Sequence, residues 1–193
     1  MSAPMSALDQ ARAELRRAAI LASLYVVWPR PLGAGQLVRS LPDDVAVTLD
    51  DIAPDLHYLT ERGVLEVVAE RDASRRVDLL RLTAAGVDAH EADPEQPVHV
   101  VRALRMLRLV ILDTLRDAAA QGASPRLIRV SLTRHADLDT SPKAIDRALA
   151  YLVAAGVARA DDKTGLHYIT AAGDDYLRGA GADIPGLAAP LSL

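Results

Sequence analysis

Basic side chains in the second half of the chain are spaced in a way that suits phosphate binding. Lys143 and Arg147 are four residues apart and follow Ser141-Pro142, a pair typical of a helix start. One turn of helix separates them, so both side chains are expected on the same face. Further candidates surround them in the sequence: Arg126, Arg129, Arg134, Lys163 and His167. Such groups neutralise phosphates, and each contact makes binding more sensitive to salt.

A smaller basic group lies in the first half of the chain, in the segment ERDASRRVD. Arg75 and Arg76 are candidates for contact with a nucleic-acid backbone or a minor groove, with Arg71 beside them. These arginines alternate with acidic residues, and a solvated loop explains them equally well.

Residues for catalysis or metal binding form no recognisable pattern. The 193-residue chain has no Cys, which excludes disulfides, thiolate nucleophiles and Cys-based zinc sites. Its five histidines do not form an HExxH spacing, and the chain lacks GxSxG, P-loop and GxGxxG motifs. Acid pairs such as Asp161-Asp162 stand where turns and helix starts favour them. We therefore expect no enzymatic activity, no metal and no cofactor.

The elements that would position the basic residues occur twice. The phrase TAAG stands in both halves of the chain, and other residues match it at similar offsets. The matching pairs lie 87 to 93 residues apart: Ile20 with Ile111, Tyr58 with Tyr151, Gly63 with Gly156, and Thr83 with Thr170. Offsets that change little and in a consistent order indicate one supersecondary unit that has been copied.

The repeat predicts two domains. The segment EADPEQP is rich in Pro and acids, as linkers are. We place the first domain at residues 1–92, the linker at 93–97 and the second domain at 98–179. Residues 180–193 are rich in Gly and Pro and are expected to form a flexible tail, although its Ile184 and Leu187 could dock.

Each copy is predicted to contain three helices, a two-stranded hairpin and a further helix. In the second copy these are a long helix at about 98–120, a short helix at 126–132, a helix from Pro142, a hairpin in 158–170 and a helix from Thr170. The short helix is expected to have Ser124 as its N-cap and Pro125 at its first position. Ile145, Leu149 and Leu152 form one apolar stripe, and Gly156 is placed to end that helix in the left-handed conformation. The first copy has the same order with a longer hairpin. The predicted fold class is mainly α with small β wings.

The pattern LxYLxxxGVL, then a polar hairpin and LTxxG, resembles winged-helix proteins of the MarR and PadR type. The resemblance covers both halves and implies two winged-helix domains in tandem. In such families the third helix, the recognition helix, precedes the wing and enters the major groove. A chain with two winged helices also resembles the kleisin-binding subunits of condensin-like complexes, in which these modules bind protein.

The outward faces of the two predicted recognition helices differ. In the second copy the outward positions are Lys143, Arg147, Ala150 and Ala154, and in the first they are Asp50, Pro54, His57 and Glu61. A duplex would be repelled by the acidic face. Only the second copy is therefore expected to bind DNA, although residues 93–193 have 12 basic and 12 acidic residues and no net positive charge.

These observations lead to two expectations about function. The first is a cytoplasmic transcriptional regulator that binds duplex DNA through its second domain. The second is a non-enzymatic assembly adaptor, as in condensin-like or mobile-element complexes, whose modules bind protein partners.

The apolar run from Ala18 to Trp28 is too short to span a bilayer, so no membrane partner is expected. Its hydrophobicity favours contact with the other domain or a second copy in a homodimer. The three arginines at Arg102, Arg105 and Arg108 are expected on the wet side of an amphipathic helix.

Overall fold

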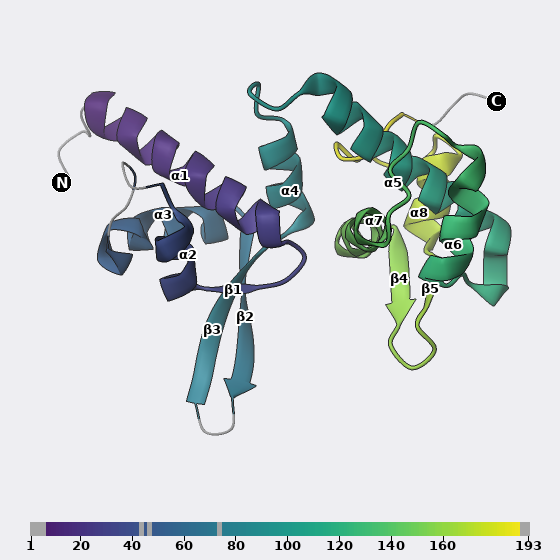
Figure 1. Ribbon diagram of the computed structural model, residues 1–193, viewed down its shortest axis with the longest axis horizontal. Helices are drawn as coiled ribbons and strands as arrows, with labels where there is room; N and C mark the ends of the chain where they lie inside the picture. Colours follow the sequence, from purple (N-terminus) through teal and green to yellow (C-terminus); the bar gives the residue numbers. More distant parts are fainter. Residues whose placement is uncertain (1–6, 43–44, 46–47, 73–74, 190–193) are drawn as a thin grey trace. The chain divides into compact units, whose positions relative to one another are not determined.

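The protein folds into two compact units, Met1–His90 and Glu91–Leu193. The computed structural model describes the backbone of residues 7–42, 45, 48–72 and 75–189, and the side chains of these residues outside 69–78. It is mainly helical with small antiparallel strands, as predicted. Figure 1 shows helices and a hairpin in both units.

Unit 1, Met1–His90, places its helices around the base of a hairpin. Its described elements are α1 (Ala7–Val27), β1 (Leu32–Gly33), α2 (Ala34–Ser40), α3 (Leu49–Glu61), β2 (Leu65–Asp72), β3 (Arg75–Leu82) and α4 (Ala84–Glu91), of which the last residue, Glu91, belongs to unit 2. The strands form an antiparallel sheet in the order β1-β3-β2. Ile20 and Leu24 of α1 are fully buried and pack in a core with Ile52 of α3 and Leu82 of β3.

Unit 2, Glu91–Leu193, has the same order of helices and hairpin. Its described elements are α5 (Val98–Ala118), η1 (Ala119–Gln121), α6 (Pro125–Ser131), η2 (Leu132–Arg134), α7 (Pro142–Ala154), β4 (Ala158–Asp161), β5 (Leu166–Ile169) and α8 (Ala171–Leu177). Ile111, Leu112 and Leu115 of α5 are fully buried. Burying each of these side chains contributes about 1.5–3 kcal/mol, so the core depends on α5.

Equivalent residues make equivalent strand contacts in the two units. In unit 1, Leu32 of β1 pairs with Leu80 of β3. In unit 2, Ala123 forms an isolated antiparallel bridge with His167 of β5. In each unit a short extended segment therefore pairs with the second strand of the hairpin. The paired residues of the two units correspond to each other at the same offsets as the sequence repeat. The β4 and β5 strands have four residues each against eight in β2 and β3, as the longer first hairpin predicts.

The residues of the TAAG phrase attach the last helix of each unit to the C-terminal end of its third helix. In unit 2 the Thr170 hydroxyl accepts from the Gly173 N–H at 3.2 Å and donates to the Gly156 carbonyl at 2.8 Å. Gly156 has φ +75, the left-handed conformation that favours glycine. Gly173 lies so close to the Val157 carbonyl that a Cβ would come within 2.3 Å of that oxygen. The matching residues in unit 1 are Thr83, Gly63, Gly86 and Val64.

An arginine also stacks on the tyrosine of the third helix in both units. The guanidinium carbon of Arg17 lies 3.9 Å from the centre of the Tyr58 ring, and that of Arg108 lies 3.9 Å from the centre of the Tyr151 ring. The position of Asp55, which pairs with Arg16 and Arg17 in unit 1, is filled by Ala148 in unit 2. A cation over an aromatic face is stabilising, most of all where both groups are desolvated.

Trp28 belongs to the core of unit 1. It is buried, and its indole N–H donates to the Leu82 carbonyl at 3.0 Å. The predicted contact of this helix with another domain or a second copy therefore does not involve Trp28. The same helix, α1, exposes Leu8, Leu15 and Val26 instead.

The segment after α8 packs against unit 2 as far as it is described. Leu187 is buried, the Arg108 guanidinium donates to the Gly186 carbonyl at 3.0 Å, and the Tyr176 hydroxyl donates to the Ala188 carbonyl at 2.9 Å. The prediction of a flexible tail is therefore wrong for residues 180–189. Their apolar side chains and backbone carbonyls contact other parts of unit 2, and composition alone does not reveal these contacts. Residues 190–193 lie outside the described chain.

Candidate nucleic-acid interface

Local capping fixes where α6 and α7 begin. The Ser124 hydroxyl accepts from the Leu127 N–H at 3.2 Å, and the Ser141 hydroxyl accepts from the Ala144 N–H at 3.3 Å. In each case a proline occupies the first helical position, where a missing N–H has no cost. Both helix starts were predicted from the sequence and are confirmed.

The orientation of α7 follows from its apolar stripe. Ile145, Leu149 and Leu152 are buried, as predicted. On the opposite side Lys143 is exposed, whereas Arg147 is half-buried and already has an interaction partner within the chain. Lys143 is therefore the readily available cation of this helix, and Arg147 is not.

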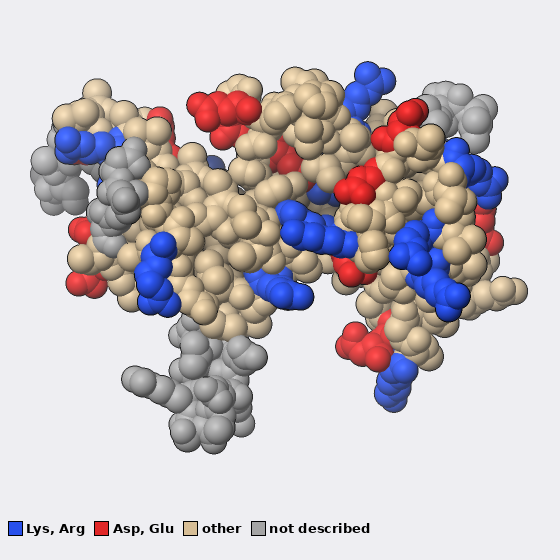
Figure 2. Space-filling view, in the orientation of Figure 1, with Lys and Arg blue, Asp and Glu red and all other residues tan. Residues whose placement is uncertain are grey.

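Five of the predicted cations are exposed and form no ion pair within the described part of the chain. They are Arg126, Arg129, Arg134, Lys143 and Lys163. Figure 2 shows Lys and Arg side chains over α6 and further ones at the turn between β4 and β5. Because α6 packs against α7, the structure brings the α6 arginines close to the recognition-helix candidate. Lys163 stands apart from them at the hairpin turn.

Acidic side chains lie between these cations. Asp146 is exposed on α7, and Asp162 is exposed beside Lys163. A hydrogen bond from the Thr164 side chain and one from the Lys163 N–H lower the pKa of Asp161, which holds the hairpin turn. Asp161 therefore has a structural role, and the positive potential of this surface is local.

Two exposed apolar residues on α6 were not predicted from the sequence. Leu127 is 53% exposed and Val130 is 58% exposed, and they alternate with Arg126 and Arg129. The seven-residue length of α6 is too short for a reliable apolar period, which is why its outer face could not be assigned beforehand.

His167 is a structural residue and not an exposed cation of the hairpin. It is half-buried, its Nδ1 is shut off from solvent without a hydrogen-bond partner, and its backbone exchanges two 2.9 Å hydrogen bonds with Ala123. Burial lowers the pKa of His167, although the charge of Asp146 opposes this effect. Its burial and its lowered pKa both oppose a positive charge, so His167 does not add to the exposed cations of the hairpin.

This environment predicts a pH-dependent stability. The folded-state pKa of His167 lies below the ordinary value of 6.5, so the unfolded chain binds more protons as the pH falls. Its contribution to stability is complete above about pH 6.5 and is lost on acidification toward the folded-state pKa. A His167→Gln variant should show a shallower fall of the urea midpoint between about pH 7.5 and 5.5. An unchanged pH profile for His167→Gln would contradict this assignment.

Arg75 and Arg76 begin β3, where their backbones pair with Asp72 and Arg71 of β2. Their side chains lie outside the described ones. The second basic group therefore remains a sequence prediction.

The third helix of unit 1 presents a different surface. Asp50, Pro54, His57 and Glu61 are all exposed on α3, in agreement with the predicted outward face. His57 lies 3.3 Å from Glu61, so its side chain faces an acid. The face of α3 that corresponds to the α7 surface is therefore acidic.

The residue that anchors α7 was missed in the sequence. Arg108 makes a bidentate pair with Glu91 at 2.5 and 2.8 Å, with side-chain exposures of 5% and 2%, and it stacks on Tyr151 of α7. Arg17 and Arg108 match at the same 91-residue offset as Ile20 and Ile111. This match was the available signal that Arg108 faces inward.

The structure gives no indication of a metal site or a membrane span in its described residues. No group of three or more His, Asp or Glu side chains among them could hold a metal ion. Neither α1 nor α5, nor any other described helix, combines the length and the apolar character needed to cross a bilayer.

No family model, curated protein or solved structure matches the chain.

Proposed function

We propose that both units are winged-helix modules and that unit 2 binds duplex DNA, as part of a transcriptional regulator. The observation that carries the proposal is a set of five exposed cations that form no ion pair with any residue the structure describes: Arg126, Arg129, Arg134, Lys143 and Lys163. Cations held in ion pairs have a counter-charge already, whereas these five are available to phosphates.

The placement of these cations suits a duplex. Lys143 is in the first turn of α7, the end of a recognition helix that reaches base edges in helix-turn-helix proteins. Ala150 and Ala154 are small, so this face can approach a groove closely. Arg126 and Arg129 on α6 would then bind the backbone beside the groove.

Unit 1 has a different role in this proposal. The acidic outer face of α3 opposes a second duplex contact, so unit 1 would position unit 2 or pair with another copy. The exposed Leu8, Leu15 and Val26 of α1 are apolar residues that a homodimer would cover.

A second candidate function is an assembly adaptor that binds protein. It is favoured by the exposed Leu127 and Val130 on α6, since apolar side chains flanked by arginines are typical of protein interfaces. The acidic face of α3 also suits a protein partner.

Alanine variants of the cations distinguish the two functions. We expect Arg126→Ala/Arg129→Ala to weaken binding of a fluorescent duplex and to reduce the slope of log Kd against log salt by about 2, since each lost phosphate contact reduces it by about 0.9. Lys143→Ala should reduce the slope by about 1. The measurement is fluorescence anisotropy at several salt concentrations.

Arg39→Ala is the matched control, because Arg39 is an exposed arginine without a described ion pair on α2, the corresponding helix of unit 1. It should bind DNA as the wild type does. If the control and the unit 2 variants lose affinity equally, unit 2 is not the DNA-binding module.

A further inference from the structure

The exposed face of α7 has few groups that can distinguish one base pair from another. Its exposed residues are Pro142, Lys143, Asp146, Val153 and Ala154. Direct readout in the major groove relies on hydrogen bonds from Arg or Lys to guanine, from Asn or Gln to adenine, and to Asp or Glu from cytosine. Only Lys143 and Asp146 belong to these residue types. They are three residues apart, so α7 offers two polar groups in one place and none along the rest of its exposed face.

The side chains that read adenine are missing from this region. The sequence contains no Asn, and its four Gln residues are Gln10, Gln36, Gln96 and Gln121. None of these lies on α6, on α7 or in the β4-β5 hairpin. The hydroxyls of Ser131 and Thr133 donate to backbone carbonyls at 2.8 and 2.7 Å, and a hydroxyl discriminates little because it can bond to more than one base.

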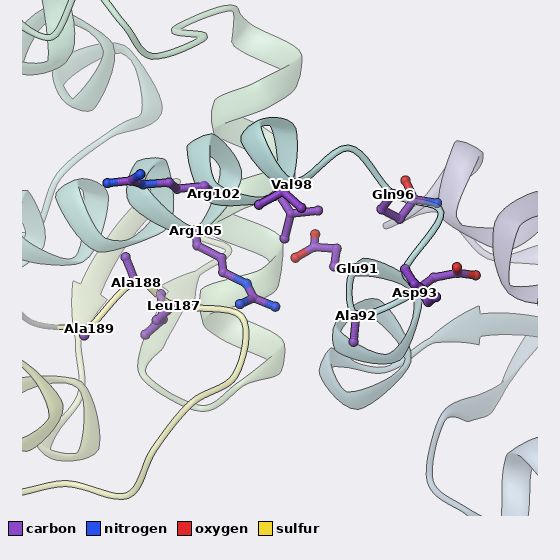
Figure 3. A pocket seen from close by; sticks show the side chains of 12 residues that line it. Glu91, Ala92, Asp93, Gln96, Val98, Arg102, Arg105, Leu187, Ala188 and Ala189 are labelled. Carbon is purple, nitrogen blue, oxygen red and sulfur yellow. The ribbon is translucent and has the colours of Figure 1, made fainter.

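The arginines of unit 2 are also poorly placed to read guanine. Arg147, the one arginine in the sequence of α7, is half-buried and already has an interaction partner within the chain. Figure 3 shows that the Arg105 side chain of α5 extends into the space between Glu91 and Leu187. The exposed arginines of α6 belong to the helix whose counterpart in helix-turn-helix proteins crosses the DNA backbone. They therefore suit phosphates and not base edges.

Asp146 limits what α7 can gain from a duplex. Its carboxylate can accept a hydrogen bond from cytosine, but it repels the phosphates that line the groove. Val153, which is 36% exposed, and Ala154 can contact a thymine methyl group but form no hydrogen bond. The favourable interactions with DNA thus come from the exposed cations of unit 2, most of which lie outside α7.

We propose that unit 2 binds duplex DNA with little sequence selectivity. Its affinity comes from phosphate contacts, which position a protein on the duplex but carry no sequence information directly. This inference rests on the proposed DNA binding and changes its substrate from a single operator to duplex DNA of any sequence. In a transcriptional regulator the choice of site would then come from outside unit 2.

Selection from a library of duplexes with a randomised centre tests the inference. The full-length protein should enrich no common sequence. Anisotropy at about 50 mM salt should give dissociation constants within about tenfold of each other for alternating A·T, alternating G·C and mixed duplexes of equal length. A sequence-specific protein separates its site from other DNA by about 10³–10⁷-fold.

The two ways in which this experiment can fail are distinct. An enriched duplex that binds more than about tenfold tighter than the mixed duplex would overturn the inference and leave DNA binding by unit 2 intact. Absence of binding to every duplex would contradict the proposed function itself, and the inference with it.

Asp146→Ala provides a second test whose expected sign cannot result from misfolding. Loss of the acid should strengthen binding of all three duplexes alike, by about two- to fivefold. Asp50→Ala removes the same charge from an exposed position on α3 of unit 1 and should bind as the wild type does. Lys143→Ala should weaken binding of the three duplexes by the same factor. The inference is overturned if Asp146→Ala or Lys143→Ala changes binding of the G·C duplex alone.

Discussion

Replacing Arg108 with alanine is expected to destabilise unit 2 by about 3–5 kcal/mol, because it removes the positive charge that pairs with the buried Glu91 carboxylate. Arg108 is buried, donates two hydrogen bonds to Glu91 and one to the Gly186 carbonyl, and stacks on Tyr151. The variant loses all of these contacts together. Urea unfolding followed by circular dichroism should show a midpoint lower by more than about 1 M.

Arg116→Ala is the control for this prediction. Arg116 pairs with Asp113 on the same helix, but both side chains are more than a third exposed. An exposed pair contributes about 0–1 kcal/mol, so this midpoint should change little. Hydrogen exchange should locate the effect of Arg108→Ala in α5 and α7. Equal midpoints for the two variants would show that the buried pair does not hold unit 2 together.

Gly173→Ala is expected to destabilise unit 2 by about 3 kcal/mol, at the upper end of typical overpacking costs. The added Cβ would lie 2.3 Å from the Val157 carbonyl oxygen and 2.9 Å from Cγ1 of Ile169. A backbone carbonyl at the start of the hairpin cannot move without breaking the contact between α8 and the end of α7. Urea unfolding measures the loss, and Gly86→Ala should have a comparable effect in unit 1, where the Val64 carbonyl lies 2.2 Å from the new Cβ.

Gly156→Ala separates this steric effect from backbone strain. Gly156 has φ +75, but a Cβ there would meet no atom within 4 Å. Its cost is that of a left-handed alanine, about 1–2 kcal/mol. If Gly173→Ala is no more destabilising than Gly156→Ala, the close approach to the carbonyl has been overestimated.

Short-range rules predicted much of the fold. Ser124, Ser141 and Thr170 cap helices as expected, since a side chain that caps a helix acts within three residues of its own position. The conformation of Gly156 and the buried stripe of α7 follow from equally local patterns. The sequence repeat made it possible to predict the order of the elements in both units, because a pattern that is weak in one copy could be recognised from the other copy.

The three arginines of α5 show where local rules fail. A spacing of three residues rotates the side chain by about 60° around the helix at each step, so three arginines do not share one face. Arg102 is exposed, Arg105 is half-buried and Arg108 is buried, whereas all three were expected on the wet side. The partner that makes burial of Arg108 favourable is Glu91, 17 residues away, and no local pattern connects the two.

The candidate interface was predicted in part. Exposure of Lys143 follows from the apolar stripe on the opposite side of α7, whereas exposure of the α6 arginines follows only from the general preference of Arg for the surface. The pairing of His167 with Ala123 joins segments that are far apart in the sequence, and no local pattern predicted it or the interaction of Arg147 within the chain. Leu127 and Val130 were missed because a helix of two turns gives little periodicity.

Binding of a labelled mixed-sequence duplex to the wild-type protein tests the central claim most directly. Anisotropy titrations between about 50 and 200 mM salt should give a slope of log Kd against log salt of about 4 to 5, the value for five phosphate contacts. Absence of binding at about 50 mM salt, by a protein whose circular dichroism shows it to be folded, would contradict DNA binding by unit 2 and would favour a protein partner.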